Sequence, residues 1–485
     1  MMQAYQFNDE QFIAGHWLKG TSTHTLNNLN PYTQELILKL QAASLVDVDS
    51  AYFAAERSFA TWSQTLPSER KNIILRVLDV VKNRREEIVH WLIQESGSTR
   101  LKANLEVDAV LGIINEAMTF PERMTTRELQ STDPDRKSYA VQKPLGVIAV
   151  ISPWNFPFHL SMRSVVTAIA IGNCVVLKPA TDTPITGGLL LAKIFEEAGL
   201  PQGVFSVVAG LGSEIGDYFV EHDTPKMISF TGSTLVGKRV GQLAVRGNHL
   251  KRIALELGGN APLVVLDDAD IDLAVELAVM GRFLHQGQIC MSTNRVIVDA
   301  KVYDVFVEKL IQRTKNLSYG DPSNENTLIG PIINASQVEK IRQMISQALQ
   351  EGTKLVVHDE IQGNVIPPHI FVDVNPDSSL AKEESFGPVL PIIKAQNESD
   401  ALRLANDTAY GLSSAVCTSD LERGKHFAMQ IDAGMTHLNS ITVADQPNAP
   451  FGGEKNSGLG RFNGQWILEE FSRTHWLTIP NTERQ

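Results

Sequence analysis

Hydrophobic positions follow two different spacings along the chain, and the change falls near residue 145. Between 47 and 119 apolar residues recur at steps of three and four, as in Ile73, Ile74 and Val77. This spacing places apolar side chains on one face of a helix with 3.6 residues per turn. The first part of the chain is therefore predicted to form a series of amphipathic helices.

Beyond residue 145 the chain alternates short apolar runs with helical patterns. Helical spacing fills Pro184–Ala198 and Gly212–Glu221. The runs that we expect to form strands are Val147–Ile151, Cys174–Leu177, Phe205–Val208, Met227–Phe230 and Ile253–Leu255. Such alternation predicts a parallel sheet covered by helices on both faces. The same alternation restarts at Ala261, which indicates a second α/β domain.

A polar segment separates the helical part from these strands. Residues 125–136 are almost entirely polar, and residues 137–144 then alternate like a strand. This pattern favours a projecting hairpin or arm.

Composition and charge narrow the class of protein. The 485 residues include 43 Lys and Arg against 55 Asp and Glu, a formal charge of −12, so nothing favours a nucleic-acid partner. The longest charge-free stretch near the middle, residues 164–177, is shorter than the ~20 residues that cross a bilayer, so no membrane partner is expected. The 3 cysteines are odd in number and widely separated, which favours a reducing, cytoplasmic compartment over a disulfide framework.

Two motifs follow predicted strands and precede predicted helices. Residues 153–157 read PWNFP, and residues 230–237 read FTGSTLVG. Open α/β sheets bind ligands at the carboxyl ends of their strands, and a helix that begins with small residues presents its N–H groups to an anion. The alternatives are a proline-bounded turn with a packed tryptophan and an ordinary Gly-Ser-Thr helix cap.

Two further motifs carry chemically reactive side chains. Glu256 ends an apolar strand before two glycines, a setting that disfavours its charged form and raises its pKa toward that of a general base. Cys290 follows a glycine-containing turn at the end of a helical pattern, and a thiolate is a strong nucleophile. The alternatives are a salt-bridged glutamate and a buried, inert cysteine.

These segments resemble the aldehyde dehydrogenase superfamily across nearly the whole chain. The motifs, in order, are PWNFP (153–157), FTGSTLVG (230–237), LELGGNAP (255–262), FLHQGQIC (283–290), ESFGP (384–388) and PFGG (450–453). The stretches around Cys290 and PFGG are further similar to the bacterial benzaldehyde, vanillin and salicylaldehyde dehydrogenase branch.

The resemblance implies an α/β fold with three parts. These are a Rossmann-type cofactor-binding domain (1–122 and 145–258), an α/β catalytic domain (259–454) and a β-strand oligomerisation arm (123–144 and 471–485). The arm implies a homodimer or homotetramer.

The resemblance also implies a mechanism that needs no metal. Cys290 attacks the aldehyde carbon, and the Asn155 amide with the Cys290 backbone N–H stabilises the oxyanion. Hydride transfer to NAD or NADP leaves a thioester, which water activated by Glu256 hydrolyses.

For the cofactor, the resemblance assigns residues from four of the motifs and from the segment after Leu177. They are Trp154, Lys178, Thr181, Gly232, Ser233, Gly237, Leu257, Glu384 and Phe386. A glutamate, which repels a 2′-phosphate, commonly occupies the position of Thr181 in strictly NAD-using members. We therefore expect that NADP is accepted as well as NAD.

Substrate choice depends on the helix that Pro157 opens. Residues at four-residue steps, Asn155, His159 and Arg163, share one side of it. Expected pocket residues are Phe156, His159, Leu160, Arg163, Leu284, Ile289 and Met291. An apolar slot with few polar contacts favours an aromatic aldehyde; alternatively, Arg163 is a structural ion-pair partner.

Three other functions remain open. The first is an aldehyde dehydrogenase for aliphatic aldehydes or semialdehydes. The others are a catalytically silent cofactor-binding protein and a thiol hydrolase. On a continuous helix, the five-residue step from His285 to Cys290 argues against a Cys-His pair.

Overall fold

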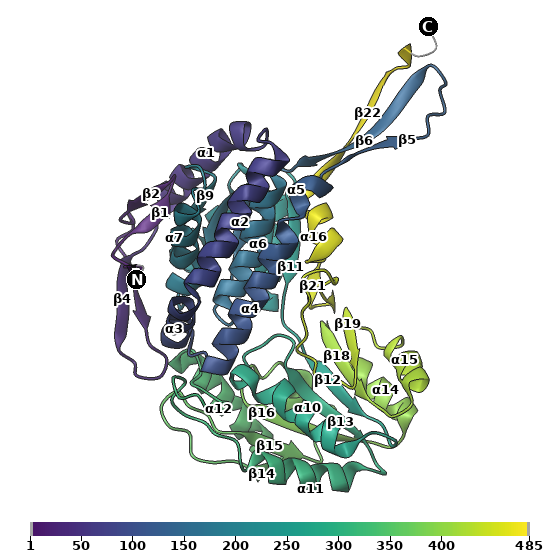
Figure 1. The fold of residues 1–485 in the computed structure, drawn as a ribbon. Helices are drawn as coiled ribbons and strands as arrows, with labels where there is room; N and C mark the ends of the chain where they lie inside the picture. Colours follow the sequence, from purple (N-terminus) through teal and green to yellow (C-terminus); the bar gives the residue numbers. More distant parts are fainter. Residues whose placement is uncertain (1–2, 483–485) are drawn as a thin grey trace.

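Two parallel sheets, each extended by antiparallel edge strands, dominate the computed structural model, which describes residues 3–482 (Figure 1). The first sheet has 8 strands, in the order β2 (His16–Leu18), β1 (Gln11–Ile13), β9 (Phe205–Val207), β8 (Cys174–Lys178), β7 (Val147–Ile151), β10 (Pro225–Thr231), β11 (Arg252–Glu256) and β21 (Gly458–Leu459). Strands β7 to β11 are parallel to one another, and antiparallel strands complete both edges. The five predicted strands are thus the five parallel strands of this sheet.

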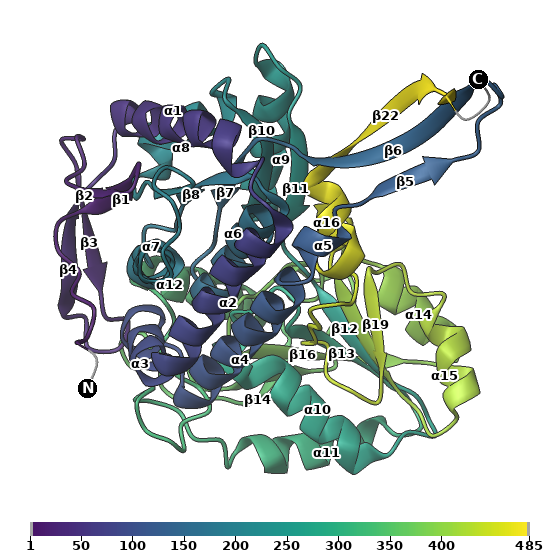
Figure 2. The ribbon, with the colours of Figure 1, turned by 45° about the horizontal axis from the view of Figure 1, so that its top comes forward.

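Helices cover both faces of the first sheet because its strands are apolar on both sides. One face packs against α6 (Pro157–Ile171) and α7 (Leu190–Glu197), which follows a π-helical turn at Ile185–Leu189. The other face packs against α1 (Leu45–Trp62), α8 (Gly212–Glu221) and α9 (Thr234–Arg246) (Figure 2). The remaining predicted helices form an outer layer beside α6: α2 (Pro67–Asn83), α3 (Arg85–Ser96) and α4 (Arg100–Ala117). The short helix α5 (Phe120–Arg123), which lies beyond the predicted run, also packs against α6.

The second sheet has 7 strands and contains the predicted second alternation. Their order is β14 (Lys354–Val357), β15 (His369–Val372), β16 (Val389–Ala395), β13 (Thr293–Asp299), β12 (Ala261–Val265), β18 (Ser413–Cys417) and β19 (Met435–Leu438). All of them run parallel except β14.

Successive side chains of β12 face opposite sides of this sheet, as the period of two in a strand requires. Leu263 and Val265 pack against α10 (Ile271–Phe283) and α11 (Tyr303–Thr314). Val264 packs on the other face against α12 (Ala335–Gln350), α14 (Glu398–Asn406) and α15 (Leu421–Ala428). The mixed α/β fold with two helix-covered parallel sheets agrees with the predicted fold class.

A three-stranded antiparallel arm projects from the body (Figure 1). Its strands are β5 (Thr126–Leu129), β6 (Arg136–Pro144) and β22 (Ser472–Pro480), which follows α16 (Gly464–Glu470). The predicted polar arm is thus formed by a hairpin to which a distant segment adds the third strand.

Several short elements were not predicted from the sequence. They are the hairpin of β3 (Thr25–Leu29) and β4 (Leu36–Gln41), the helix α13 (Ser379–Lys382), and the strand pair β17 (Tyr410–Gly411) and β20 (Glu454–Lys455). Within residues 3–482, no helix combines the length and the apolar character needed to cross a membrane.

Candidate active site

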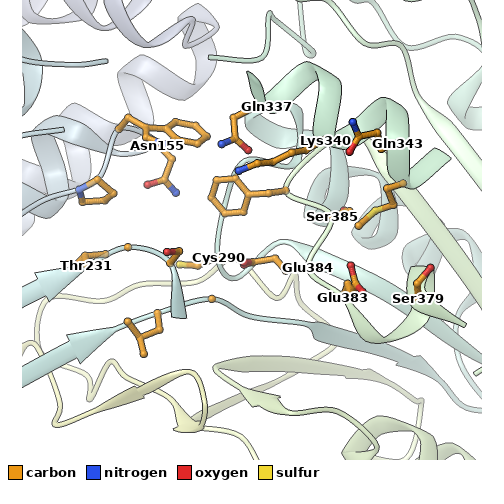
Figure 3. Close-up of a pocket in the computed structure, with 18 of the residues that line it drawn as sticks. Asn155, Thr231, Cys290, Gln337, Lys340, Gln343, Ser379, Glu383, Glu384 and Ser385 are labelled. Carbon is orange, nitrogen blue, oxygen red and sulfur yellow. The ribbon is translucent and has the colours of Figure 1, made fainter. Parts of the chain in front are cut away.

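A cavity of about 480 Å³ lies where the two sheets meet, which is within the range of about 300 to 1,000 Å³ usual for small-molecule sites. Segments that follow β7, β10 and β11 line one side, and Cys290, the loop before β16 and α12 line the other. In Figure 3, Asn155, Cys290 and Glu384 point into the same hollow. The predicted site residues that line it are Trp154, Asn155, Leu160, Gly232, Ser233, Leu257, Cys290, Glu384 and Phe386.

The segment before Cys290 leaves the helix earlier than the sequence predicts. Helix α10 ends at Phe283, and His285 and Gln286 have positive φ angles of 50° and 57°. The Gln286 side chain donates to the backbone carbonyls of Gly97 and Pro331, and such tertiary bonds hold this conformation. The interpretation that placed His285 on a continuous helix is therefore wrong.

The Cys290 thiol is predominantly protonated at neutral pH. Burial, together with the negative charges of Glu384 and Glu256, raises its pKa to about 12. The charge of Arg163 and a backbone hydrogen bond from Met291 act in the opposite direction. A thiol of this kind needs a neighbouring base before it becomes a nucleophile.

Glu256 has the properties of such a base. It is the last residue of β11, its exposed fraction is 2%, and neither carboxylate oxygen has a hydrogen-bond partner among residues 3–482. Burial raises its pKa to about 8, while the charges of Arg163 and Arg461 oppose the shift. The elevated pKa expected for a carboxyl group at an apolar strand end is found.

The Asn155 side chain is oriented by one hydrogen bond. Its Nδ2 donates to the Gln288 carbonyl oxygen at 2.9 Å, and Gln288 Oε1 accepts from the Ile333 backbone N–H at 3.0 Å. An amide nitrogen carries two hydrogens. One hydrogen therefore fixes the amide against the Cys290 loop, and the second is left for a ligand oxygen.

The first turn of α9 opens onto the cavity and suits an anion. Ser233 is the N-cap residue and its Oγ accepts from the Val236 backbone N–H, while Gly232 lines the cavity beside it. A Cβ at Gly237 would lie 2.2 Å from Leu257 Cδ2, so glycine lets the helix pack closely on the β11 end without displacing the Leu257 side chain. Backbone N–H groups at a helix N-terminus fit the pyrophosphate of a dinucleotide.

The loop before β16 presents a carboxylate and an aromatic ring to the cavity. Glu384 Oε1 accepts from the Gly259 backbone N–H at 2.8 Å, and burial raises the Glu384 pKa to about 7. Phe386, with φ +45°, packs edge-on against Trp154 with ring centroids 5.4 Å apart. Buried Arg282 holds this loop by donating from Nε to the Gly387 carbonyl at 2.9 Å. The carboxylate suits a ribose hydroxyl.

Lys178 and Thr181 lie at the end of β8 and in the turn beyond it, outside the cavity lining. Lys178 is buried, which lowers its pKa to about 8. Thr181 is partly buried. Of the residues that the structure describes, no group of three or more His, Cys, Asp or Glu side chains could hold a metal ion.

The predicted substrate-pocket residues do not all line the cavity. Leu160 lines it. His159 contacts Asp445 instead, with 3.5 Å between His159 Nε2 and Asp445 Oδ2. Leu284, Ile289 and Met291 belong to the main hydrophobic core, and Phe156 packs against it.

Arg163 contacts aromatic rings instead of a carboxylate. Its guanidinium carbon lies 4.6 Å from the Phe451 ring centroid and 4.4 Å from that of Phe462. Its three nitrogens are buried and have no hydrogen-bond partner within the described chain. The alternative of a structural ion pair therefore finds no partner in residues 3–482.

Sequence reasoning missed the side of the cavity formed by α12. Gln337, Lys340 and Gln343 project from this helix toward the hollow (Figure 3). The helix itself is detectable, because Val338, Ile341 and Ile345 recur at three and four. Their spacing shows which face is apolar, but it does not show that the polar face borders a cavity.

The comparisons with known proteins identify the family of the chain. The model of the aldehyde dehydrogenase family matches residues 17–477, and the chain belongs to that family. It is 53% identical over 473 residues to a vanillin dehydrogenase from Corynebacterium glutamicum, covering 98% of each chain.

Two solved structures are similar along almost their whole length. One is an NAD-dependent benzaldehyde dehydrogenase from Corynebacterium glutamicum, with a TM-score of 0.90, 49% identity and 98% of each chain covered. The other is a salicylaldehyde dehydrogenase from Pseudomonas putida G7 complexed with salicylaldehyde, with a TM-score of 0.95, 36% identity and 99% of each chain covered. The predicted family and branch are confirmed.

The pKa of Glu256 leads to a pH prediction. Because a general base acts in its ionised form, kcat/KM for the aldehyde should rise about tenfold per pH unit below pH ~8 and level off above it. The measurement is initial-rate kinetics from pH 6 to 9.5 at saturating cofactor. Glu256→Gln should lower kcat/KM and abolish its rise with pH, whereas Glu469→Gln on the exposed side of α16 should leave that rise unchanged. A wild-type profile that is flat across this range would contradict the assignment.

Proposed function

We propose that the chain oxidises an aromatic aldehyde to its carboxylic acid with NAD or NADP as the hydride acceptor. The observation that carries the proposal is one cavity that holds the Cys290 thiol and the Asn155 amide. The Glu256 carboxylate has no hydrogen-bond partner in residues 3–482, and its charge contributes to the raised pKa of that thiol. The three similar proteins, named for vanillin, benzaldehyde and salicylaldehyde, support an aromatic substrate.

The first step forms a carbon–sulfur bond. Glu256 takes the proton from Cys290, the sulfur attacks the aldehyde carbon, and the carbonyl π electrons move onto oxygen. The free N–H of the Asn155 amide and the Cys290 backbone N–H donate to this oxyanion. Removing one such donor typically costs about 100- to 1,000-fold in rate.

The second half of the reaction releases the acid. A bound nicotinamide would supply the hydride acceptor for the former aldehyde carbon, and Cys290 would then hold the acyl group as a thioester. Glu256 first releases the proton from Cys290 to solvent and then takes a proton from water. The resulting hydroxide adds to the thioester carbon, and the same two N–H groups stabilise the second oxyanion. The carbon–sulfur bond then breaks, the sulfur leaves as thiolate, and Glu256 returns a proton to it.

The chemistry of the residues that line the cavity suits a dinucleotide. The α9 N-terminus at Gly232 and Ser233 would hold the pyrophosphate, and Glu384 would accept hydrogen bonds from the ribose on the nicotinamide side. Lys340 and Gln337 of α12 supply donors across the cavity. On this basis we assign the first sheet and its helices to cofactor binding and the second sheet to catalysis.

Phe156 and the apolar residues beside it would form the aromatic slot. Phe156 packs perpendicular to His285, with ring centroids 5.6 Å apart, and Leu284 and Ile289 belong to the adjoining core. Aromatic walls favour a flat ring over a flexible aliphatic chain.

Cys290→Ala tests the proposed reaction. We expect oxidation of benzaldehyde or vanillin to fall by at least about 10⁴-fold while cofactor affinity is kept, because only the nucleophile is removed. Reduced nicotinamide is followed by absorbance, and cofactor affinity by fluorescence titration. Cys417→Ala in the buried strand β18 is the matched control and should remain active. Retained oxidation by Cys290→Ala would overturn the nucleophile assignment.

A panel of aldehydes distinguishes the substrate classes in the wild-type chain. Benzaldehyde and vanillin should exceed hexanal and succinic semialdehyde in kcat/KM. The opposite order would favour an aliphatic or semialdehyde dehydrogenase, and ester cleavage without aldehyde oxidation would favour a hydrolase.

We further infer that Thr181 permits NADP. The residue follows β8 close to Lys178, and it provides no negative charge that would repel a 2′-phosphate. The buried Lys178 ammonium adds a positive charge to the same turn.

Thr181→Glu should therefore make the enzyme use NADP less efficiently relative to NAD. We expect kcat/KM with NADP to fall at least about tenfold while the value with NAD stays within a factor of about three, because a carboxylate repels the 2′-phosphate. Thr181→Gln, of the same size but uncharged, is the control that isolates charge. A wild-type preference for NAD above about 1,000-fold, or ~4 kcal/mol, would contradict the inference.

We propose that the arm joins subunits into a dimer or tetramer. On β22 the side chains of Trp476, Leu477 and Ile479 are 72%, 43% and 40% exposed. Because β22 is also an edge strand, its outer N–H and C=O groups are open to another chain.

Light scattering at micromolar concentration should show an oligomer. Leu477→Glu with Ile479→Glu should shift the mass toward the monomer, because the two side chains share one face of β22 and charges there oppose burial. Leu273→Glu, at a 40% exposed position on α10, is the control. A wild-type protein that is only monomeric would contradict the proposal.

The state of the cysteines supports the cytoplasmic assignment. Cys174, Cys290 and Cys417 are all free thiols in the described chain. Reduced thiols are typical of a reducing compartment. We therefore keep the cytoplasm as the proposed location.

A further inference from the structure

A fully buried ion pair lies on α4, behind the turn that carries Asn155. Lys102 and Glu106 are one helical turn apart, both side chains are 0% exposed, and Nζ lies 2.5 Å from Oε2. Removing two charges from water is unfavourable unless the remaining hydrogen-bonding capacity of both groups is satisfied. The partners of this pair are therefore informative.

Lys102 uses all three of its donors. Besides Glu106, its Nζ donates to Ser98 Oγ at 3.0 Å and to the backbone carbonyl of Asn155 at 2.8 Å. The ammonium also lies 4.1 Å from the ring centroid of Phe156. An ammonium has three N–H groups, so none is left over, and one of them fixes the backbone of Asn155.

Glu106 holds the other side of the same turn. Its Oε1 accepts from the backbone N–H groups of Phe158, at 3.0 Å, and His159, at 3.1 Å. These groups belong to the first turn of α6, whose N-cap residue, Phe156, has no side-chain acceptor. A carboxylate from another helix thus supplies the missing cap and a favourable charge at the helix N-terminus.

We propose that Lys102 and Glu106 act as one positioning unit for the oxyanion amide of Asn155. Together they hold the turn between β7 and α6. Lys102 binds the backbone carbonyl of Asn155 within the turn, and Glu106 binds the N–H groups of the helix that follows it. The Asn155 side chain then keeps its bond to the Gln288 carbonyl and its alignment with Cys290. Neither residue contacts the reacting atoms, and the proposal rests on the proposed function.

The double variant Lys102→Met/Glu106→Gln tests this role. A single change would leave a buried charge without its partner and threaten folding. In the double variant both charges disappear and the glutamine oxygen still caps α6. The hydrogen bonds from Lys102 to the Asn155 carbonyl and to Ser98 Oγ are lost. Asp108→Asn, an exposed position on the same helix, is the control.

The double variant should lower kcat for aldehyde oxidation about 100-fold, as expected when a catalytic group is misplaced. The aldehyde KM, the cofactor dissociation constant and the rate of Cys290 alkylation by iodoacetamide should stay within a factor of about three. The deuterium isotope effect with formyl-deuterated benzaldehyde should increase. A purely structural role would change binding and alkylation as much as kcat.

Hydrolysis of 4-nitrophenyl acetate separates this proposal from the proposed substrate class. Here the Cys290 sulfur displaces 4-nitrophenolate from the acetyl carbon, water hydrolyses the thioester, and no aldehyde or cofactor takes part. Both steps pass through an oxyanion, so the double variant should lose about 100-fold here as well. A wild-type protein that cleaves the ester without oxidising aldehydes would contradict the proposed function alone.

Two outcomes would overturn the positioning role. One is a folded double variant whose kcat in both assays lies within about threefold of wild type. The other is an equal loss in cofactor affinity and thiol reactivity, which would assign the pair to general stability.

Discussion

The link between the two sheets is the constraint on which the site depends. Strand β11 ends at Glu256 and β12 begins at Ala261, so four residues join the sheets. Within this link, a Cβ on Gly258 would lie 2.7 Å from Glu384 Oε2, and one on Gly259 would lie 2.1 Å from the Cys290 carbonyl oxygen. Because both positions lack a side chain, the catalytic loop and the Glu384 loop approach the end of the first sheet closely. Glu256, the proposed base, therefore ends a strand of the first sheet, and Cys290, the proposed nucleophile, lies just before β13 of the second sheet. The charge of Glu256 still reaches the Cys290 thiol.

This close approach determines the electrostatics of the site. Cys290, Glu256 and Glu384 are three acidic groups whose pKa values are all raised, mainly by burial. The charge of either glutamate also makes ionisation of the thiol harder. In the proposed reaction, a proton moves from Cys290 to Glu256. Arg163, held between two phenylalanine rings, provides a fixed positive charge that acts on both Glu256 and Cys290.

The sequence predicts the parts of the structure that local pattern determines. The central strands are recognisable because they are apolar on both faces, and Glu256 and Asn155 are recognisable because each occurs at a strand end. His285 was placed wrongly, because hydrogen bonds from Gln286 to distant carbonyls impose left-handed backbone angles. The role of Lys102 was missed for a similar reason: its spacing to Glu106 resembles that of a surface ion pair, and only the packing of α4 on α6 shows that the pair is buried.

The arm has a consequence for the order in which the chain assembles. Strand β6 pairs with β22 along nine positions, from Arg136 with Pro480 to Pro144 with Ser472. Because synthesis proceeds from the N-terminus, β6 is complete long before β22 exists, and one edge of the β5–β6 hairpin stays open meanwhile. An open edge is a template for aggregation, and charged side chains are a common protection. Arg136 and Lys143 lie on this strand. The polar character of the arm thus protects a nascent chain that still lacks its last strand.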